Sequence, residues 1–346
     1  MAEKQVLERI RLGEVEQVRS DAQMPFTFDG SLGTLRQPDG SIRFWETDLG
    51  TKPYYFLFRG TERDPLRERE GTFTWDYNGY SDRWPNGIWV QGLYQVEGDL
   101  LVGFCHREFF SNPRFDADGV LAGHTGGHCN SYHIGFAISE DGGLHWKYVG
   151  DVCSNVCNHG DCLANVGGVP FLVVDGWFYL YFNEYVRPDE RYVSVARCRV
   201  DETVRALRAG RLPVVRKYSG NGRWDADGMN GVGAPVVPIS PGCDAHSDAA
   251  YCAPLDRYLL TVQTHGTGRL LLYLSEDGVH WFDCIVLDTV EENSCMHPYS
   301  TFVDASSDAS ADMSTVGRDF YVYFPRKSLR DYGLDTWYRR KVTIVD

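Results

Sequence analysis

Two segments of this chain repeat one another, and their pattern restricts the fold to one built from β-hairpins. Residues 136–146 read Phe-Ala-Ile-Ser-Glu-Asp-Gly-Gly-Leu-His-Trp, and residues 272–281 read Leu-Tyr-Leu-Ser-Glu-Asp-Gly-Val-His-Trp. In each segment Asp can cap the amides of a turn, Gly can adopt a positive φ, and Trp can fold back over the turn. The repeat therefore predicts two similar strand–turn–strand units.

The spacing of the repeat predicts how many such units the chain holds. Its two tryptophans are 135 positions apart, about twice the mean spacing of 68 residues between apolar segments suited to innermost strands. A four-stranded propeller blade needs roughly 40–50 residues, and more where loops are longer. We therefore predict an all-β fold: a five-bladed β-propeller with four-stranded antiparallel blades around a central channel. The predicted innermost strands begin near Phe26, Ile88, Val166, Asp244 and Pro298.

The first 25 residues have a different pattern from the rest. Apolar residues recur among charges at a spacing typical of a helix, at Val6, Ile10, Leu12, Val15 and Val18. We expect an N-terminal helical segment over residues 1–25, packed on one catalytic propeller domain over residues 26–346. No Pro- or Ser-rich linker and no block of charge divides this domain.

Composition limits the partners of the protein. The formal net charge of −14 disfavours nucleic acid and anionic membrane surfaces as partners, because both attract basic proteins. Aromatic residues make up 14 % of the chain and suit both strands and stacking on sugar rings. A neutral oligosaccharide or polysaccharide fits best. The sequence has no apolar run that could span a membrane and no signal peptide, so we expect a cytoplasmic protein, or a secreted one if a signal has been removed. It does not indicate an oligomeric state.

Several short motifs resemble those of a known superfamily. They are Phe28-Asp-Gly-Ser-Leu-Gly33, Phe44-Trp-Glu-Thr47, the strand from Leu100 to Glu108, Val166-Gly-Gly-Val-Pro170 and His246-Ser-Asp-Ala-Ala-Tyr251. This set resembles the five-bladed glycoside hydrolases, which include arabinanases, xylosidases, fructosidases and galactofuranosidases, and most of all the endo-D-arabinanase-like bacterial propellers. The repeated turn resembles the Asp-box of sialidases. The resemblance implies hydrolysis of a glycosidic bond in a furanoside or a similar neutral glycan.

Glycoside hydrolysis requires two carboxyl groups beside one bond, one protonated and one ionised. Innermost strands line a propeller channel, so acids near their starts converge on one mouth. On this basis the candidate catalytic residues are Asp29, Glu46, Glu108 and Asp248. Each also has a structural interpretation: a turn for Asp29, a solvated strand end for Glu46, an ion pair with Arg107 for Glu108, and a channel hydrogen bond for Asp248.

Other side chains near these acids are candidates for binding the sugar. Histidine and tyrosine can hydrogen-bond hydroxyl groups, and tryptophan can stack on a sugar face. The candidate substrate-binding residues are His106, His246, Glu184, Tyr299, Trp84 and Trp89. Glu184 and Tyr299 have a structural alternative, as a surface acid at a strand end and as an ordinary core aromatic. Trp224, also in a loop-like segment, is a further stacking candidate.

Two clusters of cysteine and histidine leave several interpretations open. Cys153, Cys157, His159 and Cys162 offer four groups suited to zinc, but their spacing matches no common zinc motif, so a disulfide or free thiols remain as alternatives. His124, His128, Cys129 and His133 form a similar group. We predict no metal site and no required cofactor, although the resemblance allows a Ca²⁺ ion in the channel.

Two other functions compete with hydrolysis. The same acids and aromatics could serve a carbohydrate-binding propeller that catalyses nothing. A sialidase-like enzyme would need clustered arginines for the carboxylate of its substrate. Arg36, Arg43, Arg107 and Arg197 are present, but no motif brings three of them together.

Overall fold

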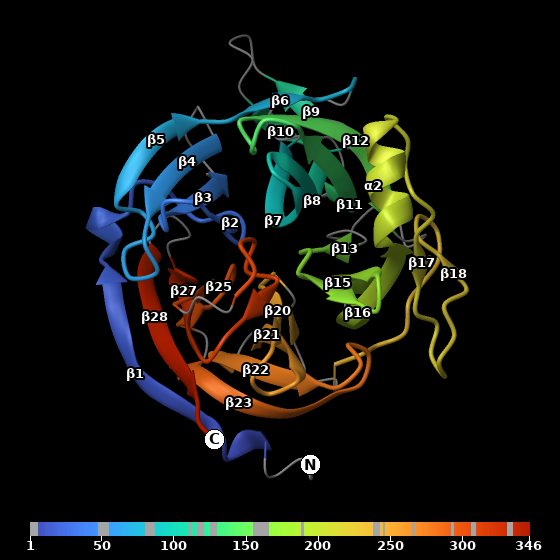
Figure 1. Cartoon of the computed structure of the whole chain (residues 1–346). Helices are drawn as coiled ribbons and strands as arrows, with labels where there is room; N and C mark the ends of the chain where they lie inside the picture. The colour runs from blue at the N-terminus through green and yellow to red at the C-terminus, as the bar shows by residue number, and fades with distance from the viewer. Residues whose placement is uncertain are drawn as a thin grey trace.

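The protein folds into a ring of five sheets, which confirms the predicted five-bladed β-propeller (Figure 1). The computed structural model describes residues 6–346 apart from residues 48–54, 80–86, 111–112, 116–120, 125–129, 155–165, 188–189, 238–242, 245, 265–266, 292–293, 306–308 and 331–334. Among the described residues the one longer helix, α2 (Val200–Arg208), lies outside the ring, and no helix is long and apolar enough to cross a membrane.

Blades 1 and 2 are antiparallel sheets of successive strands. Blade 1 consists of β2 (Gly33–Arg36), β3 (Ile42–Thr47), β4 (Tyr55–Gly60) and β5 (Glu68–Thr72). Blade 2 consists of β7 (Gly87–Glu97), β8 (Leu100–Phe110), β11 (Asn130–Ser139) and β12 (His145–Cys153), with β6 (Thr74–Asp76) added in parallel to β12. A small separate ribbon, β9 (Pro113–Phe115) and β10 (Leu121–His124), extends from the β8–β11 connection.

Blades 3 and 4 each have a divided innermost strand. Blade 3 consists of β13 (Val166–Gly167), β14 (Phe171–Val174), β15 (Trp177–Arg187), β16 (Glu190–Arg199), β17 (Arg216–Lys217) and β18 (Ala226–Asp227). Blade 4 consists of β19 (Cys243–Asp244), β20 (Ala249–Cys252), β21 (Arg257–Thr264), β22 (Arg269–Ser275) and β23 (Trp281–Thr289), with β26 (Thr315–Val316) beside β20.

Blade 5 joins the first described strand to the last. It consists of β24 (Cys295–Met296), β25 (Thr301–Asp304), β27 (Asp319–Ser328), β28 (Asp335–Ile344) and, outermost, β1 (Ile10–Arg19). β1 runs antiparallel to β28, with Ile10 opposite Ile344. A short 3-10 turn, η1 (Asp21–Gln23), then leads into blade 1.

Each blade is apolar on both faces because it is packed between two neighbours. In β22, Leu270, Leu272 and Leu274 pack toward blade 5, whereas Leu271 and Tyr273 pack toward blade 3. Such strands therefore read as continuous apolar runs without a clean alternation. Five buried clusters result, one at each joint between blades.

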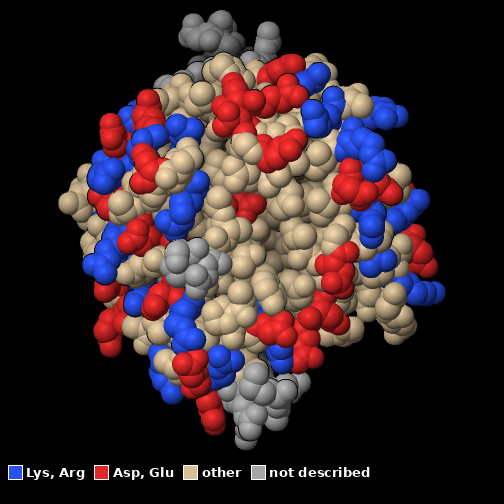
Figure 2. All heavy atoms as spheres, in the orientation of Figure 1, with Lys and Arg blue, Asp and Glu red and all other residues tan. Residues whose placement is uncertain are grey.

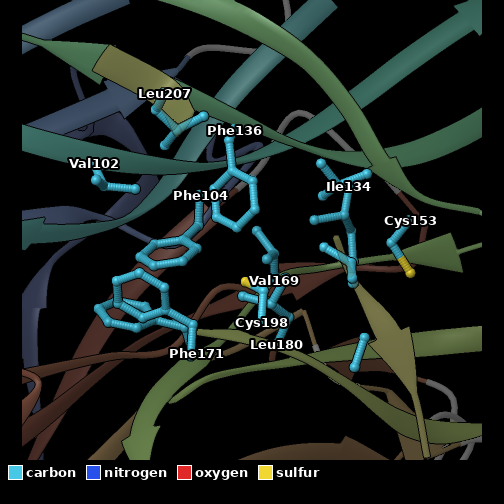
Figure 3. Close-up of a cluster of buried hydrophobic side chains, with 14 of the residues drawn as sticks. Val102, Phe104, Ile134, Phe136, Cys153, Val169, Phe171, Leu180, Cys198 and Leu207 are labelled. Carbon is cyan, nitrogen blue, oxygen red and sulfur yellow. The ribbon is translucent and has the colours of Figure 1, made fainter. Parts of the chain in front are cut away.

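Figure 3 shows the cluster between blades 2 and 3. Phe104 of β8 stacks on Phe171 of β14 with ring centroids 4.0 Å apart, and Phe136 meets Phe104 edge-on. Leu207 of α2 packs against the same cluster. Helix α2 is thereby fixed to the ring.

The two repeated segments form the predicted hairpin turns, one joining β11 to β12 and one joining β22 to β23. In the first, Ser139 Oγ accepts the amide of Gly143 at 2.9 Å and Asp141 Oδ1 accepts that of His145 at 2.9 Å. In the second, Asp277 Oδ1 accepts the amide of His280 at 2.8 Å. The glycines adopt positive φ, and the tryptophans that follow are buried.

The helix expected over the first 25 residues is wrong for Ile10–Arg19, which form strand β1. The pairing of β1 with β28 shifts register between Leu12 and Val15. An extra residue at this bulge changes which side chains face the core, so Leu12 and Val15 are three rather than two positions apart. The bulge therefore produces a spacing that resembles that of a helix. The predicted domain boundary at residue 25 is also misplaced, because β1 belongs to blade 5 of the propeller.

A buried ion pair also fastens blade 1 to blade 5. Lys327 Nζ donates to the carbonyl oxygen of Phe28 at 2.9 Å and lies 3.4 Å from Asp335 Oδ2, and the amide of Phe28 donates to the same Asp335 oxygen at 2.9 Å. Both charged side chains are about 1 % exposed. They hold both polar groups of the Phe28 backbone, next to Asp29.

Replacing Lys327 with Met is expected to lower the free energy of unfolding by about 3–5 kcal/mol, because Asp335 would stay buried without its cation. The double variant Lys327→Met/Asp335→Leu should regain part of this loss. As a matched control, Lys341→Met breaks an exposed pair with Asp319 and should cost less than about 1 kcal/mol. Denaturant unfolding measures all three; equal losses for Lys327→Met and Lys341→Met would contradict the expectation.

Candidate functional site

The ends of strands from all five blades meet at one mouth of the channel. Asp29 precedes β2, Gly167 ends β13, His246 precedes β20 and Tyr299 precedes β25, so each lies at the innermost strand of its blade. Blade 2 contributes Glu108 from β8, paired with the first residue of β7. In Figure 2 the surface around the axis is mostly uncharged, with an acidic group recessed near the centre.

A chain of contacts connects these side chains. His106 Nε2 lies 3.1 Å from Glu108 Oε1, and the His106 ring lies 5.5 Å from the ring of His246. The His246 ring lies 6.0 Å from that of Tyr299, whose hydroxyl donates a long hydrogen bond of 3.4 Å to Asp29 Oδ1. Five sequence-predicted residues are therefore neighbours across four blades.

Asp29 and Glu108 form an electrostatically linked pair. Burial, followed by the charge of Glu108, raises the pKa of Asp29 well above its usual range, although Lys327, His246 and Tyr299 lower it. Burial raises the pKa of Glu108 to about 7, against an opposing effect of His246. Because like charges resist joint ionisation, the pair retains a proton near neutral pH.

The His246 ring is held from several sides. Its Nδ1 lies 3.0 Å from Asn183 Nδ2 of β15, and its carbonyl oxygen accepts the amide of Tyr299 at 2.5 Å. Gly167 leaves room for the ring: a Cβ at residue 167 would lie 2.9 Å from His246 Cε1. The position of this imidazole therefore depends on blade 3 as well as blades 4 and 5.

Tyr299 has an unusual backbone conformation. Its φ is +62°, in the left-handed region that non-glycine residues seldom adopt. Such conformations cost on the order of 1–3 kcal/mol and cluster at functional sites. Here the conformation accompanies contacts of its amide with His246 and of its hydroxyl with Asp29.

Asp248 has a clear structural task. Its Oδ2 accepts the amide of Phe302 at 2.8 Å, and its Oδ1 accepts the amide of Ala249 at 2.8 Å. It thereby ties blade 4 to the innermost strand of blade 5. Burial raises its pKa to about 7 despite these two hydrogen bonds. The predicted channel hydrogen bond is present, and the catalytic role of Asp248 stays a prediction.

Among the four candidate acids, Glu108 is the one whose charge acts on Asp29. Glu46 is buried at 1 % exposure in β3, and Glu108 is the carboxyl group with the strongest charge effect on Asp29. Arg107 binds Asp151 at 2.6 Å rather than serving Glu108, since neighbouring residues of a strand face opposite sides. The side chain of Glu108 contacts His106 instead.

Glu184 and Trp89 are buried, Trp84 cannot be placed, and the sugar-binding roles of all three stay predictions. Glu184 is fully buried with Lys217, which lies 2.9 Å from its Oε1 and also donates to Ser154 and Gly231 carbonyl oxygens. Trp89 is 3 % exposed within β7, where it packs against His106, so its ring faces are not open for stacking. Trp84 lies outside the described residues.

The arginines considered for a sialidase-like site have separate partners. Arg43 pairs with Glu70, Arg107 pairs with Asp151, and Arg36 donates to the carbonyl oxygen of Asp304. Arg197 lies in β16 of blade 3. These separate environments do not assemble an arginine triad.

The described residues hold no group of three or more His, Cys, Asp or Glu side chains arranged for a metal ion. Cys153 has a buried thiol, and burial raises its pKa to about 12. Cys157, His159, Cys162, His128 and Cys129 fall outside the described residues, as does the side chain of His124. His133 contacts Asp151 at 2.9 Å.

Sequence reasoning missed three residues of the site. They are Asn183, Gly167 and Tyr132, whose ring lies 5.3 Å from that of His106. Asn183 immediately precedes the predicted Glu184, and in a strand these two face opposite sides. The alternation of side chains between the two faces of β15 could therefore have identified Asn183 as a residue of the site.

Comparisons with known proteins give likenesses of low identity. No protein-family model and no curated protein matches the chain. Three solved structures, each 12 % identical, are similar. A protein of unknown function from Dyadobacter fermentans has a TM-score of 0.44 (97 % of this chain, 100 % of that one). A GH43_1 enzyme from Xanthomonas citri has a TM-score of 0.49 (99 % and 92 %). The α-L-arabinofuranosidase Arb93A from Fusarium graminearum has a TM-score of 0.46 (96 % and 98 %). At these values no residue role is transferred from them.

Replacing Gly167 with Ala should displace the His246 ring while leaving the fold intact, because the new Cβ would meet an imidazole rather than backbone. The expected result is a shift of the His246 ring resonances in NMR spectra with little change in melting temperature. Gly13→Ala, where the nearest atom lies at 3.4 Å, is the matched control. Unmoved His246 resonances in Gly167→Ala would refute the proposed packing.

Proposed function

We propose that this protein is a glycoside hydrolase in which Asp29 and Glu108 divide the acid and base roles. The observation that carries the proposal is the electrostatic link between two carboxyl groups, both with raised pKa, at the mouth of the propeller channel. A pair that holds one proton near neutral pH supplies the two forms of carboxyl group that glycoside hydrolysis uses.

The pKa shifts indicate which group has which role. The negative charge of Glu108 contributes to the raised pKa of Asp29, which means that Glu108 ionises while Asp29 is still protonated. Asp29 would then protonate the leaving oxygen of the glycosidic bond. Ionised Glu108 would activate water or attack the anomeric carbon.

The neighbours of the pair are suited to a neutral sugar. His106, His246 and Tyr299 offer hydrogen-bonding groups close to Asp29 and Glu108, and Asn183 orients His246. The surface around the axis is largely uncharged (Figure 2), so it would not demand an anionic ligand. We propose a furanoside or a similar neutral glycan as substrate, in line with the motifs near Asp29 and His246.

The direct test is product release from plant, fungal and mycobacterial glycans by wild type, Asp29→Asn and Glu108→Gln. Each amide change should lower kcat by about 10²–10⁴-fold, because each removes a proton-transfer group. Glu140→Gln, at an exposed position of blade 2, is the control and should retain activity. Full activity in both variants would refute the assignment. No product from wild type, together with a glycan that raises its melting temperature, would favour a binding protein.

The pH dependence of kcat/KM should follow Glu108. Because its pKa is about 7, Glu108 is mainly protonated below that pH and cannot act as the base. We expect kcat/KM to rise as the pH increases through about 7, where Glu108 loses its proton. Initial rates from pH 5 to 10 test this, and an optimum near pH 5 would contradict it.

A further inference from the structure

The outer part of blade 3, at the rim of the ring rather than at its axis, has a cavity of its own (Figure 1). It encloses about 510 Å³ and is lined by Trp177, Arg197, Arg199, Glu202, Val214, Arg216 and Trp224. Three arginines face one carboxylate in this lining. Figure 2 shows basic groups interspersed with acidic ones at the right-hand rim, over α2, β17 and β18.

Strand register places two of these arginines directly opposite each other. Arg197 of β16 pairs with Arg216 of β17, which pairs in turn with Asp227 of β18. Like charges at opposite positions of neighbouring strands destabilise a sheet. Asp227 compensates Arg216 at 2.9 Å, but this pair is half exposed, so it contributes little to stability and can rearrange around a ligand.

Arg197 is oriented by aromatic rings rather than by an acid. Its guanidinium lies 4.3 Å from the ring of Trp177 and 4.2 Å from that of Trp224, and it is hydrogen-bonded to Tyr179. Within the described part of the chain, Arg197 makes no ion pair with a carboxylate. A rigidly held, partly buried guanidinium of this kind is suited to binding a carboxylate or sulfate through paired hydrogen bonds.

The remainder of the lining is apolar and aromatic. Val214 is 71 % exposed, and Trp177 and Trp224 are both partly exposed beside it. Aromatic and aliphatic surface next to a guanidinium suits a sugar ring that carries a negative group. A volume of about 510 Å³ is sufficient for one or two sugar units.

We propose that this cavity is a second saccharide-binding site that recognises an anionic sugar through Arg197 and Arg216. The shared chemistry is an oxyanion on a sugar ring, either the carboxylate of a uronate or a sulfate ester. The site is separate from the channel and its existence does not depend on the proposed hydrolase activity.

Calorimetric titration of the full chain tests the proposal. The ligands are a galacturonate trisaccharide, a sulfated disaccharide, a neutral trisaccharide, inorganic sulfate and an acidic peptide. We expect saturable binding of at least one anionic sugar, weakened by salt, and weakened about tenfold or more in Arg197→Met. Arg211→Gln, which removes an exposed charge from the same blade, should bind as wild type does.

Several outcomes would overturn the proposal: no binding of either anionic sugar, equal binding of the neutral sugar, or unchanged affinity in Arg197→Met. Sulfate or the acidic peptide binding as tightly as the sugars would refute the saccharide assignment. A purely structural Arg197 predicts a lower melting temperature without loss of affinity. If Arg197→Met does not fold, Arg216→Met tests the same cavity from an exposed position.

Discussion

The pairing of β1 with β28 is the constraint on which the rest of the molecule depends. A ring of blades holds its shape only if the last blade is fixed to the first, and here β1 supplies the outermost strand of blade 5 before the chain enters blade 1. Lys327 and Asp335 add a second link by holding the backbone of Phe28. Asp29 follows directly, so closure of the ring and placement of a candidate catalytic acid are parts of one arrangement.

The propeller architecture accounts for the carboxyl groups with raised pKa at the channel mouth. Each blade is covered on both faces, which leaves the strand ends near the axis as the place where polar side chains can gather. Burial there raises the pKa of Asp29, Glu108 and Asp248, but the three carboxyl groups differ in their hydrogen-bond partners. Asp248 accepts two backbone amides and joins blades, whereas Asp29 and Glu108 face histidine and tyrosine side chains. The last two are therefore the better candidates for chemistry.

The sequence predicts the ring more completely than the site. The hairpin repeat and the spacing of apolar runs carry the blade number, and the predicted strand starts at Ile88 and Val166 lie within one residue of β7 and β13. Ambiguity arises where a local pattern fits two structures. A bulge made β1 resemble a helix, and Glu184 at a strand end is a buried partner of Lys217. Partners across blades, such as Glu108 for Asp29, depend on how the ring closes, which no local pattern encodes.

The register of β1 against β28 also has a consequence for how the chain folds. Ile10 pairs with Ile344, so β1 remains without its partner until all of the other described strands have been synthesised. Such distant contacts slow folding, and a waiting strand offers an unpaired edge to other chains. The charged side chains of Arg11, Glu14 and Glu16 on that strand oppose aggregation during this interval.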